Sequence, residues 1–267
     1  MRGILKFILL LFCLCILYLA ITNLYYYLGV FFNYLASISE SLILNNFSKI
    51  YNALGKTFEL LLYSLPIGFI LSLFFALGRV SKIKLLSKLV ASYIFLIRGT
   101  PLLVQIYLIY FGLGSIKAIR ESFLWIALKE PFWCGVIALT INTVAYGSEI
   151  FRGGIQSVSK GQIESGKSLG FNTFGIYRRI IFPIALRQVL PTYGNELILM
   201  VKATSLVSLT TYMEMTGIAR KIIAKTFAPV EAFIAAGILY LFLNFLMVQL
   251  IKYLEWKYNP HLRLSNR

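Results

Sequence analysis

Long apolar stretches alternate with short clusters of basic residues along this chain. A helix that crosses the hydrocarbon core of a bilayer, about 30 Å thick, needs about 20 mostly apolar residues, because each residue adds about 1.5 Å. Six stretches reach this length, at approximately residues 4–22, 57–78, 93–113, 132–152, 191–211 and 230–252. The pattern predicts an all-α polytopic membrane protein with about six transmembrane helices.

The first apolar stretch follows Arg2 and Lys6 and has two interpretations. A basic start and an apolar centre are also features of a secretory signal peptide. The stretch is long for a signal, and no small-x-small cleavage site stands out before the aromatic cluster at residues 25–27, which is typical of a membrane interface. We therefore expect residues 1–56 to form a retained transmembrane anchor followed by an extracytoplasmic segment.

The basic residues indicate how the chain is oriented. It has 26 Lys and Arg against 10 acidic residues, all of them Glu, and a net charge of +16. With the N-terminus in the cytoplasm, 17 basic residues lie inside, eight lie outside, and Lys202 falls within a span. The positive-inside rule therefore predicts that both termini are cytoplasmic, with residues 256–267 as a tail. Because the basic residues lie in clusters between spans, the positive-inside rule accounts for the net charge without a nucleic-acid partner.

The extramembrane segments are short. None exceeds about 40 residues, so we expect one membrane domain at residues 57–255, with a cytoplasmic loop at 153–190. An ATPase domain would not fit in such a loop. Any energy source or soluble receptor must therefore come from separate chains.

Residues 161–168 match the phosphate-binding pattern G-x-x-x-x-G-K-S. A P-loop links a buried strand to a helix, and an Asp from another strand completes its magnesium site. This chain contains no Asp, and a membrane helix precedes the motif. We therefore expect this chain to bind no ATP.

The chain offers little for catalysis or metal binding. Cys13, Cys15 and Cys134 lie in apolar sequence, and His261 stands alone near the C-terminus. None of them has the spacing of a metal site, and no nucleophile and base converge. We expect neither enzymatic activity nor a bound metal or cofactor.

The loop after the fourth span contains a succession of helix caps. Ser159 begins a capping box, so residues 160–169 read as a short helix that ends at Gly170. Asn172 is placed to cap a second helix that runs to a break at Pro183, and a third short helical stretch follows. The caps favour a loop folded to dock a partner over the alternative, a plain solvated loop.

The same loop resembles the Glu-Ala-Ala loop of binding-protein-dependent ABC permeases. The resemblance rests on residues at the family's spacing, namely Glu164, Ser165, Gly166, Gly170, Ile180 and Pro183. In that family the short helix is a coupling helix that sits in a groove of the ATPase subunit. Ser165 and Gly166 replace two alanines and Phe182 replaces a leucine, but Ser and Gly are still small enough for close approach to a partner.

The resemblance extends over about residues 55–255. Residues 98–113, 145–155 and 194–206 look like the corresponding segments of the polar amino acid branch, whose substrates include histidine, glutamine and arginine. The family core has five helices, so the first span is either an added anchor or a variation at the edge of the family.

The resemblance implies a non-catalytic permease subunit of an ATP-driven importer for polar amino acids in the cytoplasmic (inner) membrane. It implies a cytoplasmic ATPase dimer that holds ATP and Mg, an extracytoplasmic amino acid binding protein, and a second permease subunit, identical or homologous. Which amino acid is carried, and whether the permeases form a homodimer or a heterodimer, stays open. The spans alone also fit a channel or ion-coupled carrier without an ATPase, but that alternative does not explain the capped loop.

Polar residues at membrane depth are candidates for the substrate path, because they are costly in lipid and usually face a cavity or the bundle interior. Asn142, Tyr146 and Glu149 lie on one face of their span, and Asn195 and Lys202 repeat the i, i+7 spacing on the next. The candidates are Asn142, Tyr146 and Glu149 on one span, and Asn195, Glu196, Lys202, Thr204 and Ser205 on the next. The alternative is that these residues make helix-to-helix contacts or extend to the membrane surface. For Glu149 the sequence supports the two interpretations equally.

Two basic residues have open roles. Lys202 lies deep in its span and needs a partner, either Glu196, a carboxylate of a neighbouring subunit, or a substrate carboxylate. Arg98 precedes Gly99 and Pro101, where a helix begins or bends, and it either shapes a gate or anchors the span at the interface.

Overall fold

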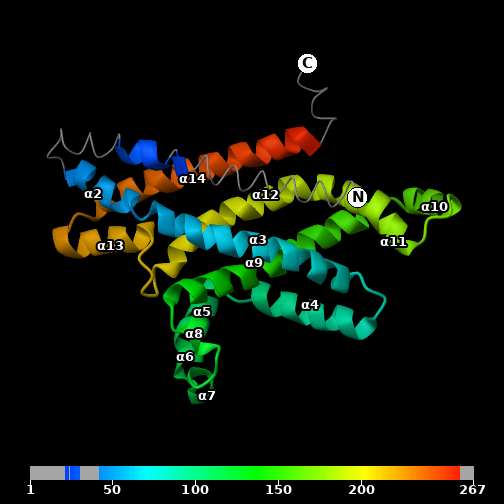
Figure 1. Cartoon of the computed structure of the whole chain (residues 1–267), viewed down its shortest axis with the longest axis horizontal. Helices are drawn as coiled ribbons and strands as arrows, with labels where there is room; N and C mark the ends of the chain where they lie inside the picture. Colours follow the sequence, from blue (N-terminus) through cyan, green and yellow to red (C-terminus); the bar gives the residue numbers. More distant parts are fainter. Residues whose placement is uncertain (1–21, 24, 31–41, 259–267) are drawn as a thin grey trace.

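The computed structural model describes residues 22–23, 25–30 and 42–258, and this part of the chain is nearly all helical, without strands (Figure 1). All but the last residue of the predicted first span, residues 4–22, and most of the tail lie outside the described residues. The helices are α2 (Leu42–Tyr51), α3 (Leu54–Arg79), α4 (Lys84–Arg98), α5 (Leu102–Tyr107), the π-helical η1 (Leu108–Gly112), α6 (Leu113–Ser115), α7 (Lys117–Arg120), α8 (Trp125–Leu128), α9 (Pro131–Gln156), α10 (Lys160–Ser168), α11 (Thr173–Ile176), the π-helical η2 (Tyr177–Ile181), α12 (Phe182–Val207), α13 (Met215–Thr226) and α14 (Pro229–Tyr258).

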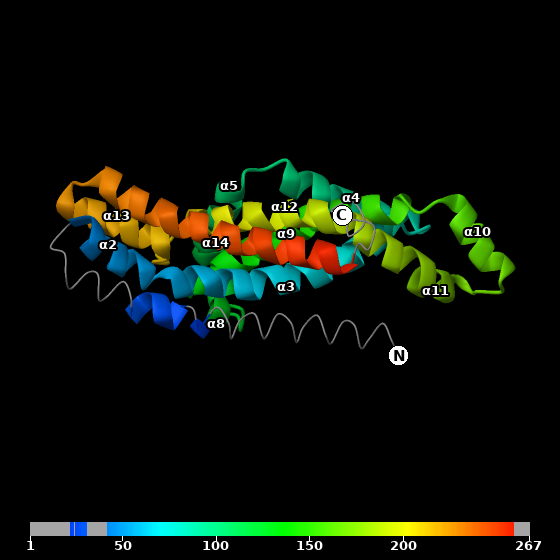
Figure 2. The same ribbon diagram turned by 90° about the horizontal axis from the view of Figure 1, so that it is seen from above.

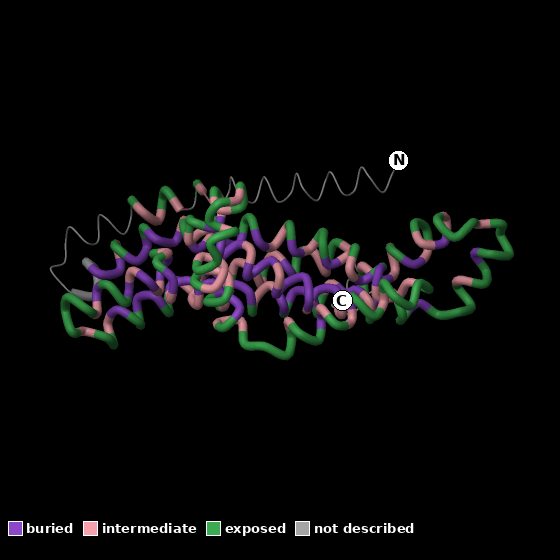
Figure 3. Tube along the Cα trace, turned by 90° about the horizontal axis from the view of Figure 1, so that it is seen from below, coloured by how far each residue is buried: buried purple, intermediate pink, exposed green. Residues whose placement is uncertain are grey.

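Four long helices, α3, α9, α12 and α14, run along the long axis of the molecule (Figures 1 and 2). One end of this bundle carries α10 and α11 and is called the loop end; the other carries α2 and α13 and is called the α13 end. α9 lies in the centre, where it packs against α3 and α12. Buried segments follow the middle of the bundle and exposed segments its outside (Figure 3).

The long helices meet the requirements for crossing a membrane. Asn46–Arg79, Pro131–Gln156 and Pro229–Tyr258 are long and apolar enough to span it, and they contain three of the predicted spans. The window of highest hydropathy is 72% buried in Pro131–Gln156 but only 33% and 28% in the other two, whose exposed apolar faces suit contact with lipid. These helices confirm the prediction of a polytopic all-α membrane protein.

The predicted stretch 93–113 is not one straight helix. α4 and the helix Leu102–Ser115 are bent by 101° at the intervening residues 99–101. Pro101 has no amide hydrogen and disfavours a helical conformation at Thr100, so the helix cannot continue. The bend falls where the sequence indicated that a helix begins or bends.

The predicted break at Pro183, with a third short helical stretch after it, is wrong. α11, η2 and α12 follow one another without interruption, so the chain is helical from Thr173 to Val207. Pro183 is the second residue after the π-helical turn of η2, in the first turn of α12, where a missing amide hydrogen is tolerated. As a consequence, the predicted span 191–211 begins earlier, at Phe182, and its helix ends at Val207.

Glycines of α9 allow its neighbours to approach closely. A Cβ atom on Gly147 would collide with Ser72 of α3. One on Gly154 would collide with Val189 and lie 3.0 Å from the carbonyl oxygen of Ala185, both on α12. Small residues at such contacts let membrane helices pack by their backbones.

We expect Gly154→Leu to destabilise the fold by about 1–3 kcal/mol, because it forces α9 away from α12. Gly153→Leu is the matched control, since a Cβ atom on Gly153 meets nothing within 4 Å. Thermal unfolding of the detergent-solubilised protein checks the prediction. Equal unfolding temperatures for the two variants would contradict the proposed close packing.

Candidate functional site

The bend between α4 and α5 is stabilised by the side chain of Gln105. Its Nε2 donates to the carbonyl oxygens of Ile97 at 2.8 Å and Thr100 at 3.1 Å, and it lies 2.9 Å from Thr100 Oγ1. Helix ends leave such carbonyls without partners, which is costly at membrane depth. Gln105 Oε1 in turn accepts a hydrogen bond from Asn142 Nδ2 of α9 at 3.4 Å. The bend is therefore joined directly to the central helix.

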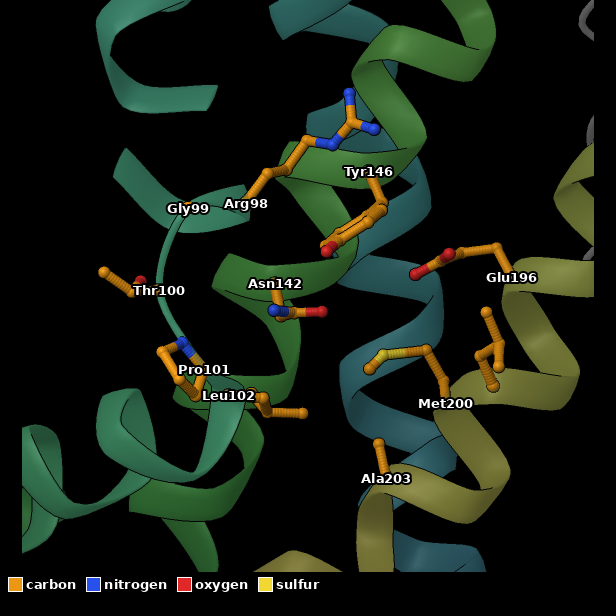
Figure 4. Close-up of a pocket in the computed structure, with 11 residues that line it drawn as sticks. Arg98, Gly99, Thr100, Pro101, Leu102, Asn142, Tyr146, Glu196, Met200 and Ala203 are labelled. Carbon is orange, nitrogen blue, oxygen red and sulfur yellow. The ribbon is translucent and has the colours of Figure 1, made fainter. Parts of the chain in front are cut away.

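An open cavity of about 510 Å³ lies beside this bend (Figure 4). Three elements form its walls: the bend, α9 and α12. The lining residues are Arg98, Gly99, Thr100, Pro101, Leu102, Asn142, Tyr146, Glu196, Leu199, Met200 and Ala203.

The cavity presents opposite charges together with uncharged polar groups. The Arg98 guanidinium lies 4.9 Å from the centre of the Tyr146 ring, as a cation–π pair. Glu196 is 6% exposed, and its carboxylate points from α12 toward α9 (Figure 4). A cation, a carboxylate, an amide and a phenol around one space suit a ligand that carries both an ammonium and a carboxylate group.

The structure brings together some of the predicted substrate-path residues and separates others. Asn142, Tyr146 and Glu196 line the cavity. Glu149 lies outside it, where its carboxylate is 2.7 Å from Arg152 and 3.7 Å from Arg79. The geometry at Glu149 thus matches the structural alternative, an ion pair that joins α3 and α9 near the loop end.

Asn195 and Lys202 are exposed on α12, outside the set of residues that line the cavity. The described residues provide no ion-pair partner for Lys202, and Glu196 is not within ion-pair distance of it. Leu199 lines the cavity and is also 58% exposed. The cavity therefore opens beside this exposed face of α12.

Thr204 and Ser205 also lie away from the cavity. Their hydroxyl groups donate to carbonyl oxygens one turn back in α12, those of Val201 at 2.7 Å and Lys202 at 2.6 Å. Thr204 is fully buried.

The caps predicted for the loop are confirmed. Ser159 Oγ accepts the amide hydrogen of Gln162 at 3.4 Å, at the start of α10. Gly170 has φ of +78°, the left-handed conformation that commonly ends a helix. Asn172 Oδ1 accepts the amide hydrogen of Gly175 at 2.8 Å, at the start of α11.

The residues that resemble the Glu-Ala-Ala loop divide into an inner and an outer group. Gly166 is buried, and a Cβ atom there would collide with Ile180 of η2, so its small size serves packing within the loop. Glu164 and Ser165 are exposed on α10. Pro183 is half-buried at the start of α12. The outward surface of α10 is therefore formed around Glu164 and Ser165.

Sequence reasoning missed Gln105 and Met200 as parts of this site. Gln105 had a signal, since it is a polar residue in an apolar run and is only 6% exposed. Met200 had none, because an apolar residue on an apolar helix does not reveal whether it faces a cavity. In the described part of the chain, no three His, Cys or Glu side chains are grouped so as to hold a metal ion.

Comparison with known proteins places this arrangement among transport permeases. The nopaline transport system permease protein NocM of Agrobacterium fabrum is 49% identical over 223 residues, which cover 83% of this chain and 92% of that protein. The histidine/lysine/arginine/ornithine transport system permease protein HisM of Escherichia coli is 39% identical over 217 residues, covering 81% of this chain and 91% of that protein.

A solved structure has the same fold. It is the crystal structure of an amino acid ABC transporter with histidines, in which the matched chain has a TM-score of 0.69 and 35% sequence identity. The match covers 78% of this chain and 94% of the other.

The family model of binding-protein-dependent transport system inner membrane components matches residues 64–259. These residues contain the bend, the cavity and the loop with its caps. The chain therefore belongs to this family of inner membrane permeases, in its polar amino acid branch.

Proposed function

We propose that the cavity between the bend, α9 and α12 is one half of the pathway of a polar amino acid importer, and that a second permease subunit supplies the other half. The observation that carries this proposal is the open side of the cavity beside a polar face of a membrane helix. This side has to be closed before a substrate is enclosed.

The exposed face of α12 supports a protein partner at this position. Gln188, Thr192, Asn195 and Lys202 recur at helical spacing on it, and all four are exposed. Polar and charged groups at membrane depth are costly when they face lipid. A second permease subunit, identical or homologous, would cover them and close the cavity.

The charges of the cavity support a zwitterionic substrate. Arg98 suits the carboxylate of an amino acid, and Glu196 suits an ammonium or a basic side chain. The E. coli relative is named for histidine, lysine, arginine and ornithine, which supports a substrate of the same class.

The loop end is proposed to face the cytoplasm and an ATPase dimer, which holds ATP and Mg. The exposure of Glu164 and Ser165 on α10 supports docking of this helix in the ATPase. α11 continues without a break into α12, so displacement of the loop is transmitted to Glu196 in the cavity wall. The opposite α13 end then faces the extracytoplasmic binding protein.

Family membership argues against the alternative function considered from the sequence, a channel or ion-coupled carrier.

We expect Glu164→Arg to release the ATPase subunit during gentle purification, because it reverses the charge on the exposed surface of α10. Mass spectrometry of the chains that co-purify measures this. Glu121→Arg is the matched control. The Glu121 side chain is 66% exposed, and it lies at the C-terminal end of α7, away from the loop end (Figure 1). Retention of the ATPase by Glu164→Arg would refute docking through α10.

We expect a photo-crosslinking amino acid at Leu199 to capture a second permease subunit in native membranes. The same probe at Leu241 of α14, which is 71% exposed, should capture no permease, because the outer face of α14 is apolar and suits lipid. Mass spectrometry of the product also decides between a homodimer and a heterodimer. A Leu199 probe that captures lipid alone would contradict a permease partner at this face.

A further inference from the structure

Glu214 is a buried carboxylate in the connection between α12 and α13. Its side chain is fully buried, whereas most of the other acidic residues of the described chain are partly or fully exposed. Oε1 accepts the amide hydrogens of Thr216 at 2.7 Å and Gly217 at 3.0 Å. These are the unpaired amides at the start of α13, so Glu214 caps that helix.

The second carboxylate oxygen joins Glu214 to two other helices. Oε2 accepts a hydrogen bond from the hydroxyl of Tyr240 on α14 at 2.6 Å and from Thr57 Oγ1 on α3 at 3.2 Å. Thr216 Oγ1 also donates to the Tyr240 hydroxyl at 3.2 Å, and Thr204 of α12 lies beside the same hydroxyl. We call these five residues, Thr57, Thr204, Glu214, Thr216 and Tyr240, the Glu214 cluster.

Capping alone does not explain this arrangement. A cap needs the bonds of Oε1 only, and a shorter side chain such as Asp supplies them without reaching other helices. No cation lies within ion-pair distance of Glu214 in the described chain, and burial raises the pKa of its carboxyl, although the four hydrogen bonds oppose this. Burial of this carboxylate costs free energy. The two bonds of Oε2 are not needed for the cap, and they connect the start of α13 to α14 and α3.

The position of the cluster relates it to the cavity. Thr204 lies eight residues after Glu196 on α12, so the cluster lies beside the end of the helix that forms one cavity wall. Glu214 itself follows the end of that helix, Val207, in the connection to α13. The opposite end of α12 is continuous with α11 and the loop. The segment that leaves one end of this helix is thus hydrogen-bonded to α3 and α14 through Glu214, and the other end is attached to the proposed site of ATPase docking.

We propose that Glu214 is a positioning residue that fixes the α13 end of α12 to α3 and α14, so that displacement of the loop tilts the cavity wall instead of shifting the whole helix. This inference rests on the proposed function, because it concerns how movement of the loop is converted into transport.

Glu214→Asp tests the inference in the complete transporter, reconstituted in liposomes with its ATPase and binding protein. Asp keeps the charge and the cap of α13 but is too short to keep the bond to Tyr240. We expect the ATPase to stay bound and ATP hydrolysis to continue, while the amount of amino acid imported per ATP falls. Tyr240→Phe, which removes the same bond from the other side, should give the same result. Glu231→Asp, at the same end of the molecule, is the matched control and should import as the wild type does.

Wild-type import per ATP in Tyr240→Phe and in any Glu214→Asp protein that folds would overturn the positioning role. If Glu214→Asp does not fold, Tyr240→Phe decides the question by itself. Failure of the proposed function is a different result, because the wild-type complex would then import no amino acid at all.

Discussion

The unbroken helix from Thr173 to Val207 is the element on which the rest of the arrangement depends. It begins in the loop, passes Glu196 in the cavity wall, and ends beside the Glu214 cluster. The helix is continuous, so a displacement of the loop is passed on toward the cavity wall, and η2 and Pro191 are the points between them at which a helix can bend. The π-helical turn before Pro183 keeps this continuity at the one place where the sequence indicated a break.

The cost of unpaired polar groups in lipid explains where the polar residues of the spans lie. Gln105 binds the carbonyls freed by the bend, and Glu149 is neutralised by Arg152 and Arg79. Glu214 uses both carboxylate oxygens within the protein. Neither Glu196 in the cavity nor Lys202 on the exposed face of α12 has an ion pair in the described chain. The cavity suits a substrate, and the exposed face suits a second subunit.

Local chemistry made much of the fold predictable from the sequence. The spans follow from the length of the apolar stretches. Ser159 and Asn172 predict where helices begin and Gly170 where one ends, because caps involve only residues close by in the sequence. Contacts between distant segments were not predictable. Helical spacing grouped Glu149 with Asn142, but only tertiary packing shows that Arg79, 70 residues earlier, lies beside it. No feature of the sequence indicates that Glu214 contacts Tyr240. Likewise, the sequence does not indicate that Gly166 packs against Ile180 of the same loop.

In the proposed function, ATP binding by the ATPase docked at the loop end changes access to the cavity through this helix. Ala203→Cys in a background without Cys13, Cys15 and Cys134 places a thiol in the cavity lining. Its labelling by a membrane-impermeant maleimide, applied from either side of the membrane, is measured with and without trapped nucleotide in the reconstituted complex. The account predicts that trapped nucleotide reduces labelling from the cytoplasmic side and increases it from the extracytoplasmic side. Labelling that does not respond to nucleotide on either side would contradict it.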